Sequence, residues 1–203
     1  MITYGTVSLK NRALEKWDKH IKTVLHENIH TSLDNYLQFV PSVTAFGMKV
    51  AGVKSTHKLR DMTVLFVLSN LIEKGIVQTI KIASSRMRPD ESTKNSFPSG
   101  HTATAFVAAE FLHQEYGYKS AWISVGGYTV ATLVGVGRML NNRHWFSDVV
   151  AGAGIGILSV KAIYWTYPSL QKIFHKKEAK ILQSGFYPSY KNGVVYLNFS
   201  HNF

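Results

Sequence analysis

Apolar and basic residues recur at helical spacing near the start of the chain. Between residues 14 and 40, apolar side chains return at steps of three and four, namely Leu14, Trp17, Ile21, Val24, Leu25, Ile29, Leu33, Tyr36 and Leu37. This period predicts an amphipathic N-terminal helix over residues 10–40. Its early polar face carries Lys10, Arg12, Lys16, Lys19 and Lys22. Such a face suits an anionic membrane interface, and it equally suits a solvated helix.

Four further helices are predicted, at residues 58–87, 101–116, 120–140 and 146–165. Two apolar runs within them, Ser120–Gly137 and Val149–Tyr167, approach the length that crosses a bilayer. Two other runs, Met62–Ile82 and Asn35–Val53, are interrupted by charged residues. The pattern predicts an all-α helical bundle with several transmembrane or membrane-embedded helices. A soluble bundle with buried Gly- and Ala-rich helices is the alternative.

The last part of the chain, residues 169–203, differs in kind. Pro168 is expected to close the helical region, and a basic surface helix with four lysines follows it. In the tail, Asn192–Gly193 favours a tight turn between two short extended arms, and Pro188 weakens the first arm. A small β-hairpin or a single strand is therefore predicted at the C-terminus.

Length and charge narrow the choice of protein class. With 203 residues, the chain predicts one domain, 1–203. The formal net charge of +11 attracts anions, whether nucleic acid, lipid headgroups or phosphate-bearing substrates. Because there is no cysteine, disulfides and thiolate metal sites are excluded. Residues 1–34 hold no continuous apolar segment of a secretory signal, so either internal segments direct insertion or a leader is missing.

One short motif suggests zinc. Residues His26 to His30 read H-E-x-x-H, a spacing that places two imidazoles on one helix face with a carboxylate beside them. A third protein ligand is not evident downstream, because no H-x-x-G-x-x-H extension follows. We therefore expect no metal site here, and we expect His26 and His30 on the polar or interfacial side of the helix.

Three stretches in the middle of the chain carry a different chemistry. Lys81 and Arg88 are seven residues apart, so a continuous helix would present both cations on one face before Pro89. In "FPSGHTATAF", Ser99, Gly100 and His101 open a helix, where unpaired backbone N–H groups and the helix dipole favour an anion.

The third stretch, "GRMLNNRHWFSD", supplies Arg138, His144 and Asp148 in order. His144 and Asp148 are four residues apart, so the carboxylate can accept a hydrogen bond from one ring nitrogen and leave the other free to attack. Singly, each stretch has a plain structural explanation. Together, three cations and a helix start suit a phosphoryl group, and two histidines suit attack and leaving-group protonation.

In this order, the motifs resemble those of the type 2 phosphatidic acid phosphatases (PAP2), a family that includes class A bacterial acid phosphatases and, more distantly, vanadium haloperoxidases. The family pattern is K-x6-R-P, P-S-G-H and S-R-x5-H-x3-D. The chain matches it with Lys81–Pro89, Pro98–His101 and Arg138–Asp148, and the resemblance covers residues 60–168 as the catalytic core. Gly137 stands where the family has serine. Arg86 and Arg143 lie beside the motifs and are interpreted as surface or secondary substrate contacts.

The resemblance implies a role for each residue. His144 would be the nucleophile of a phosphohistidine intermediate, Asp148 would orient it, and His101 would protonate the leaving oxygen and later activate water. The phosphate would be held by Lys81, Arg88, Ser99, Gly100 and Arg138. The resemblance implies no metal and no cofactor.

The sequence therefore predicts a metal-independent phosphatase that acts on a membrane lipid phosphate. The substrate would be of the phosphatidic acid, phosphatidylglycerol phosphate, undecaprenyl diphosphate or lipid A type. We expect it in a bacterial inner membrane with the site facing the periplasm, and with membrane lipids rather than nucleic acid as partners. The alternatives are a soluble periplasmic acid phosphatase, a haloperoxidase, and a basic protein that binds anionic lipid or nucleic acid.

Overall fold

The computed structural model describes residues 12–25, 32–182, 184–191 and 193–201. Their helices and strands are α2 (Arg12–Val24), α3 (Leu33–Leu37), α4 (Val40–Val50), α5 (Leu59–Ser84), α6 (Gly100–Tyr116), α7 (Ala121–Leu140), α8 (Phe146–Leu182), β1 (Ser184–Lys191) and β2 (Val194–His201). They form two compact units, residues 1–163 and 164–203, whereas the sequence predicted one domain.

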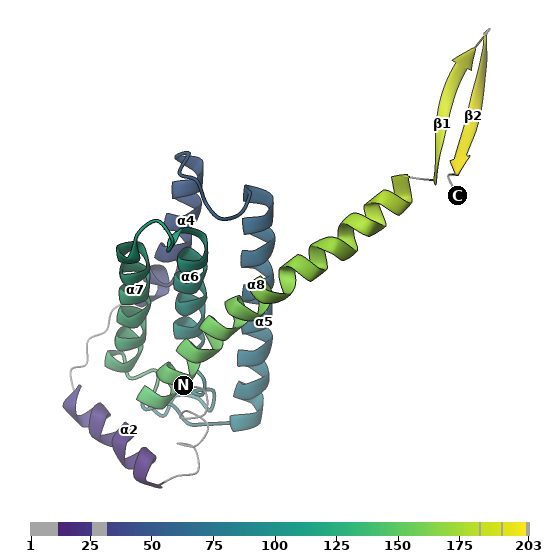
Figure 1. The fold of residues 1–203 in the computed structure, drawn as a ribbon. Helices are drawn as coiled ribbons and strands as arrows, with labels where there is room; N and C mark the ends of the chain where they lie inside the picture. Colours follow the sequence, from purple (N-terminus) through teal and green to yellow (C-terminus); the bar gives the residue numbers. More distant parts are fainter. Residues whose placement is uncertain (1–11, 26–31, 183, 192, 202–203) are drawn as a thin grey trace. The chain divides into compact units, whose positions relative to one another are not determined.

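The first unit is a helical bundle in which α6 packs against α4, α5 and α7 (Figure 1). Phe46, Phe66 and Phe111 bring one aromatic ring each from α4, α5 and α6, with centroids 5.0–5.7 Å apart. Small side chains join α6 to α7 on the other side, in a buried cluster of Ala105, Ala109, Ala131 and Val134. Small residues let the two helix backbones approach, and the aromatic rings fill the wider gap.

Two glycines bring the first half of α8 against the start of α6. A Cβ atom at Gly152 would lie 2.5 Å from the carbonyl oxygen of Ser99, and one at Gly156 would lie 2.4 Å from that of Ala103. No side chain fits at those distances, so glycine is required for this close approach. The contact holds the beginning of α6 beside the first turns of α8, where several of the predicted site residues lie.

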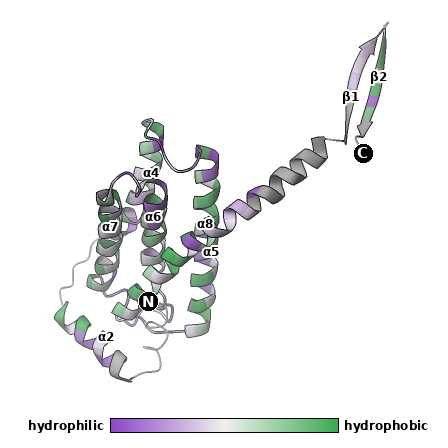
Figure 2. Ribbon diagram, viewed as in Figure 1, coloured by the Kyte–Doolittle hydropathy of each residue, from purple (hydrophilic) through white to green (hydrophobic). Residues whose placement is uncertain are grey.

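Among the described residues, three helices are long and apolar enough to cross a membrane: α5, α7 and the Phe146–Ser169 part of α8. Only 22% of the apolar window of α5 and 28% of that of α7 is buried inside the protein, so most of their apolar surface faces outward. Figure 2 shows hydrophobic residues along both helices. The two predicted spans in α7 and α8 and the interrupted one in α5 therefore meet the length and composition of membrane spans. The predicted Asn35–Val53 run does not, because it is divided between the short helices α3 and α4.

The predicted N-terminal helix over 10–40 was wrong in its extent. The structure has α2, α3 and α4 there instead, and Pro41 lies in the first turn of α4. Proline is well tolerated at a helix start because the N–H it lacks would have no partner there. Apolar residues that set this period, among them Trp17, Val24, Leu33 and Tyr36, are exposed in the structure, so the period does not mark one continuous buried face. The H-E-x-x-H motif, residues 26–30, lies outside the described residues.

The end of the helical region was also predicted wrongly. Pro168 does not close a helix, because α8 continues through it to Leu182 and includes the predicted basic segment. In the second unit, β1 and β2 form the predicted antiparallel hairpin, with Ser184 opposite His201 and Lys191 opposite Val194. Gly193 in the turn has a φ of +81°, which favours glycine.

Candidate active site

The loop after α5 carries two cations in an arrangement that the sequence did not predict. Lys81 lies in the last turn of α5, which ends at Ser84, and Ser85 then adopts a left-handed conformation with φ of 43°. The predicted helix over 58–87 was therefore too long, and Arg88 does not share a helix face with Lys81. Arg88 instead belongs to a folded loop, in which its backbone N–H donates to the carbonyl of Thr93. Lys81 donates to the carbonyl of Asn95 at 2.5 Å, which ties the loop back to α5.

The P-S-G-H motif forms the start of α6, as predicted. Ser99 is the N-cap, and its hydroxyl lies 2.9 Å from the hydroxyl of Thr102 and 3.5 Å from the Thr102 backbone nitrogen. The backbone N–H of Ser99 donates to the carbonyl of Asp148 at 3.0 Å, so the start of α6 is attached to the first turn of α8. Gly100 and His101 are the first two residues of the helix. An anion placed here meets the positive end of the helix dipole.

His144 and Asp148 lie together, and both are almost fully buried. His144 Nδ1 is 3.6 Å from Asp148 Oδ2, close enough for an ion pair and too long for a hydrogen bond. The carboxylate of Asp148 instead accepts from the Arg86 guanidinium at 2.8 Å, from the Trp145 backbone N–H at 2.8 Å, and from the hydroxyl of Ser96. These donors fix the carboxylate beside the imidazole. Catalytic hydrogen bonds are often long before substrate binds, so the 3.6 Å separation is compatible with a catalytic pair.

The predicted cations and histidines lie within electrostatic reach of one another. Burial lowers the pKa of His101 to about 4, and Arg138, His144 and Lys81 add to this effect while Asp34 opposes it. His101 begins α6, which is not one of the three candidate spans. Burial also lowers the pKa of His144, against the opposing effect of Asp148. Both imidazoles are therefore neutral near pH 7 in the site without substrate, which leaves a ring nitrogen of His144 able to act as a nucleophile.

Two arginines of the site each have a side-chain hydrogen-bond donor that no described residue uses. The Nε atoms of Arg88 and Arg138 are buried and make no hydrogen bond with the described residues. A buried guanidinium N–H without a partner is costly, and arginine forks match the oxygens of a phosphate group. Two such donors beside the start of α6 are therefore suited to an anion with several oxygens.

Several residues of the site were missed by sequence reasoning. Asp34 of α3 binds Arg138 at 2.8 Å, and Asn35 Oδ1 lies 2.9 Å from His101 Nε2. Asp18 of α2 is buried and accepts from Arg86 and from the backbone and hydroxyl of Ser147. No spacing could indicate these contacts, because they join residues 66 to 129 positions apart.

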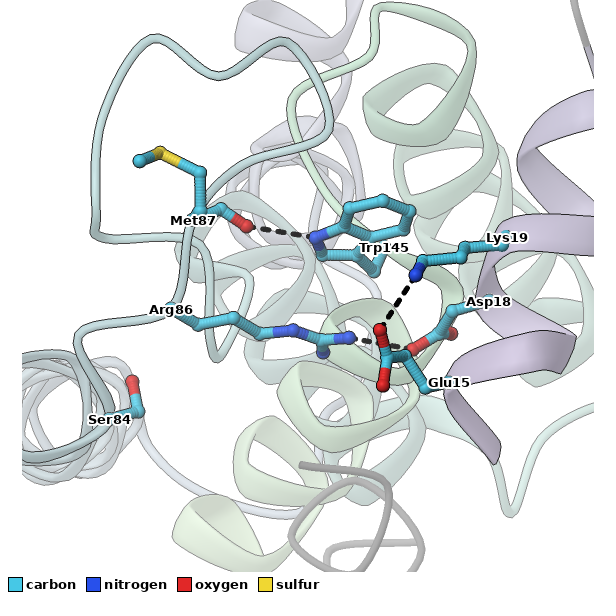
Figure 3. A pocket seen from close by; sticks show the side chains of 7 residues that line it. All are labelled: Glu15, Asp18, Lys19, Ser84, Arg86, Met87 and Trp145. Atoms are coloured by element: carbon cyan, nitrogen blue, oxygen red, sulfur yellow. Dashed lines mark hydrogen bonds and ion pairs between the residues drawn. The ribbon is translucent and has the colours of Figure 1, made fainter. Parts of the chain in front are cut away.

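Arg86 was interpreted as a surface or secondary contact, and the structure corrects this. Its side chain is only 14% exposed, and it bridges Asp148 and Asp18, each at 2.8 Å. Figure 3 shows the ion pair with Asp18 at a cavity of about 260 Å³, lined by Glu15, Asp18, Lys19, Ser84, Arg86, Met87 and Trp145. Arg143, by contrast, is 45% exposed and pairs with Asp90 at the surface.

Known proteins share this arrangement of motifs. Residues 62–172 match the PAP2 superfamily. The chain belongs to this superfamily. It is 45% identical over 139 residues to the lipid A 1-phosphatase of Porphyromonas gingivalis, a match that covers 68% of this chain and 31% of that protein. The chain thus spans about a third of the length of that relative.

Two solved PAP2 structures share the fold. The LpxE structure from Aquifex aeolicus has a TM-score of 0.54 and 23% identity. This match covers 71% of this chain and 93% of the LpxE chain. The transmembrane phosphatidylglycerolphosphate phosphatase from Bacillus subtilis has a TM-score of 0.59 and 18% identity. This match covers 82% of this chain and 94% of the Bacillus subtilis chain. The predicted family and the predicted helical fold with a small C-terminal β-hairpin are confirmed. Three apolar helices and membrane PAP2 neighbours indicate a membrane protein.

The departure from the PAP2 pattern at Gly137 can be placed in the structure. A Cβ atom there would lie 3.5 Å from the Cβ atom of Asp34, which is ordinary van der Waals contact. The missing serine side chain therefore leaves the backbone of α7 open to α3. Within the ranges that the structure describes, no three His, Asp or Glu side chains are grouped so that they could hold a metal ion.

Proposed function

We propose that this PAP2 protein is a metal-independent phosphatase that hydrolyses a phosphate ester or diphosphate of a membrane lipid through a phosphohistidine intermediate. One observation carries the proposal: two buried arginine Nε donors, which have no hydrogen-bond partner among the described residues, lie beside a neutral, buried histidine that a carboxylate faces. Anion-binding donors and a nucleophile in one place are what phosphoryl transfer needs.

The phosphate would be held from three directions. Lys81 reaches it from the end of α5, Arg88 from the following loop, and Arg138 from the last turn of α7. The backbone N–H of Gly100 and the capping residue Ser99 complete the site at the start of α6. Three positive charges offset the charge that builds up on the phosphoryl oxygens in the transition state.

The reaction would proceed in two displacements at phosphorus. His144 Nε2 attacks the phosphorus, the bond to the lipid oxygen breaks, and His101 gives a proton to that oxygen. Water then attacks the phosphohistidine, the P–N bond breaks, and His101 takes the proton from water. Asp148, which faces Nδ1, stabilises the positive charge on His144 while it carries the phosphoryl group.

His101 must carry a proton for the first displacement, although its pKa is about 4 without substrate. A phosphate with two negative charges, bound beside Arg138 and Lys81, offsets the two cations that help to lower this pKa. Substrate binding therefore favours protonation of His101, which prepares the general acid only when there is a phosphate to cleave.

The position of the site along the helices supports a membrane substrate. Lys81 lies in the last turn of α5, Arg138 in the last turn of α7, and Asp148 in the first turn of α8. These are the ends of all three candidate spans, so the site would lie at one surface of the bilayer, where lipid phosphates are found. We place it in a bacterial inner membrane with the site facing the periplasm. The similarity to a lipid A 1-phosphatase makes a lipid A-type phosphate the first substrate to test.

Phosphate release should survive chelation. We expect purified protein in detergent micelles with an excess of EDTA to release phosphate from a lipid substrate at the rate seen without EDTA. The panel would contain lipid A, phosphatidic acid, phosphatidylglycerol phosphate and undecaprenyl diphosphate, with para-nitrophenyl phosphate as the soluble comparison. Total loss with EDTA, restored by a divalent ion, would contradict histidine-only chemistry. A rate highest on the soluble ester would contradict the lipid substrate.

Arg86 provides a further prediction, because it joins α2 to the catalytic carboxylate. Arg86→Ala should lower the free energy of unfolding by about 3 kcal/mol, since it leaves the buried carboxylates of Asp148 and Asp18 without their shared cation. It should also slow phosphate release by roughly 10-fold, as Asp148 loses one of its fixed donors. The measurements are thermal unfolding in detergent and the initial rate on the best lipid substrate.

Arg143→Ala is the matched control, because it removes an arginine from the same region that is 45% exposed and pairs with a surface carboxylate. Exposed ion pairs contribute about 0–1 kcal/mol, so its stability and rate should stay near those of the wild type. Equal losses in the two variants would show that the bridge between Asp148 and Asp18 has no special part.

A further inference from the structure

A second carboxylate lies in the site, and the proposed chemistry does not use it. Asp34, in the first turn of α3, is 2% exposed and accepts a hydrogen bond from Arg138 Nη1 at 2.8 Å. The Asn141 side-chain amide lies 3.4 Å from the same oxygen. Its other oxygen, Oδ1, is buried and has no hydrogen-bond partner among the described residues. A buried carboxylate is costly, so it persists only where nearby cations offset the cost.

The same short helix also reaches the general acid. Asn35 Oδ1 lies 2.9 Å from His101 Nε2, while Asp34 favours the protonated form of the imidazole. The contact with Asn35 is made by Nε2 of the His101 ring. The charged groups that face His101 are Arg138 of α7, Lys81 of α5, His144 before α8 and Asp34 of α3. Asp34 is the anion among them.

Gly137 of α7 lies next to Asp34 of α3. The Cβ atom of Asp34 lies 3.5 Å from the place where a Cβ of residue 137 would be, which is ordinary van der Waals contact. Arg138 follows immediately in the sequence and turns one of its donors to Asp34. The departure from the family pattern therefore lies beside this carboxylate.

We infer that Asp34 is a positioning residue of the phosphatase site: its carboxylate holds Arg138 in place for the phosphate and favours the protonated state of His101. The inference rests on the proposed function. Asp148 would thus serve His144, and Asp34 would serve His101 and Arg138. Arg138 can do both tasks, because Asp34 binds Nη1, while the buried Nε has no hydrogen-bond partner in the part of the chain that the structure describes.

An experiment must also exclude the opposite role for Asp34, which is to compete with the substrate. A carboxylate on Arg138 is also a mimic of phosphate, and as such it would compete with substrate for the cation. A positioning residue supports catalysis, whereas a competitor opposes substrate binding. Removal of the charge therefore changes kcat and KM in different directions under the two roles.

The test is the kcat and KM of Asp34→Asn against pH, on the best lipid substrate of the panel, with wild type and His144→Ala assayed beside it. We expect kcat to fall about 10- to 100-fold, the range reported for loss of a supporting hydrogen-bond partner. The alkaline limb of the kcat profile, where the general acid loses its proton, should move by about one unit to lower pH, because a neighbouring negative charge is gone. Loss of folded protein would lower kcat without moving the limb.

Two further variants serve as controls for this test. Asp34→Glu retains the charge, so its limb should stay at the wild-type pH even if the longer side chain lowers kcat. Asp90→Asn removes a carboxylate that pairs with Arg143 at the surface, and it should leave both kcat and the limb within about two-fold of the wild type, as expected for an exposed pair. If Asp34→Asn does not fold, as judged by thermal unfolding, a limb in Asp34→Glu that is displaced to lower pH would itself overturn the inference.

The outcomes separate the inference from the function on which it rests. If wild type releases phosphate and His144→Ala does not, the proposed function stands. An Asp34→Asn variant with wild-type kcat and pH limb would then overturn the inference alone, and so would a lower KM with undiminished kcat, the result for a phosphate mimic. If wild type releases no phosphate from any substrate, both fall.

Discussion

His144→Ala abolishes phosphate release in our expectation, with a loss of at least about 10⁴-fold in kcat, the scale seen when a covalent nucleophile is removed. The imidazole of His144 lies beside Asp148, with its Nδ1 3.6 Å from the carboxylate. The measurement is the initial rate of phosphate release in detergent micelles, with binding of vanadate, a phosphate analogue, measured on the same sample. The variant should still bind vanadate, because Lys81, Arg88 and Arg138 are unchanged.

His113→Ala is the control for this prediction. His113 belongs to α6, like His101, and its Nδ1 lies 2.8 Å from the hydroxyl of Ser124 in the bundle, away from the cations. Its replacement should cost stability on the order of one hydrogen bond, about 1 kcal/mol, with the rate per folded molecule unchanged. A His144→Ala enzyme that keeps more than a hundredth of the wild-type rate would remove the phosphohistidine mechanism.

Asp148→Asn has the second largest expected effect, a loss of about 10³-fold or more in kcat with a smaller change in KM. The amide has the same shape, but it bears no charge to offset the positive imidazole of the intermediate. It also presents an NH₂ group to one of the three donors that now point at the carboxylate, those of Arg86, Trp145 and Ser96. The measurement is kcat and KM on the lipid substrate, together with thermal unfolding to separate lost chemistry from lost fold.

Asp18→Asn is the matched control for Asp148→Asn. Asp18 is equally buried and binds the same guanidinium of Arg86, but it lies on α2, and the carboxylate that pairs with His144 is Asp148. We expect it to lose stability and no more than about 10-fold in rate, the effect of a supporting partner. If the two variants lose activity equally, the role of Asp148 is structural support and not the orientation of His144.

The bundle could be predicted from the sequence because its signal is local. Apolar runs and helical period placed α6 and α7 within a residue or two, and the apolar run Val149–Tyr167, in which Lys161 is the one charged residue, lies within α8. The errors lay at the ends of helices. The predicted N-terminal helix is divided among α2, α3 and α4, and α8 continues through Pro168 to Leu182.

The sequence indicated the candidate residues of the site, but it did not predict the contacts that join them. The motif residues Lys81, Arg88, His101, Arg138 and His144 do lie within electrostatic reach of one another, which the order of motifs suggested. The sequence could not indicate that Arg88 reaches the site from a loop rather than from the face of α5. Nor could it assign Arg86 to Asp148, since an arginine beside a motif is usually solvated.

By itself, the sequence determined the helical class, the apolar spans and the match to the PAP2 motifs, because each is a pattern of residue types along the chain. The tertiary structure decided which partners complete those motifs. The contacts of Asp34 with Arg138 and of Asp18 with Arg86 join residues 104 and 68 positions apart. No periodicity spans such distances, and only the packing of α2 and α3 against the bundle brings these carboxylates to the cations.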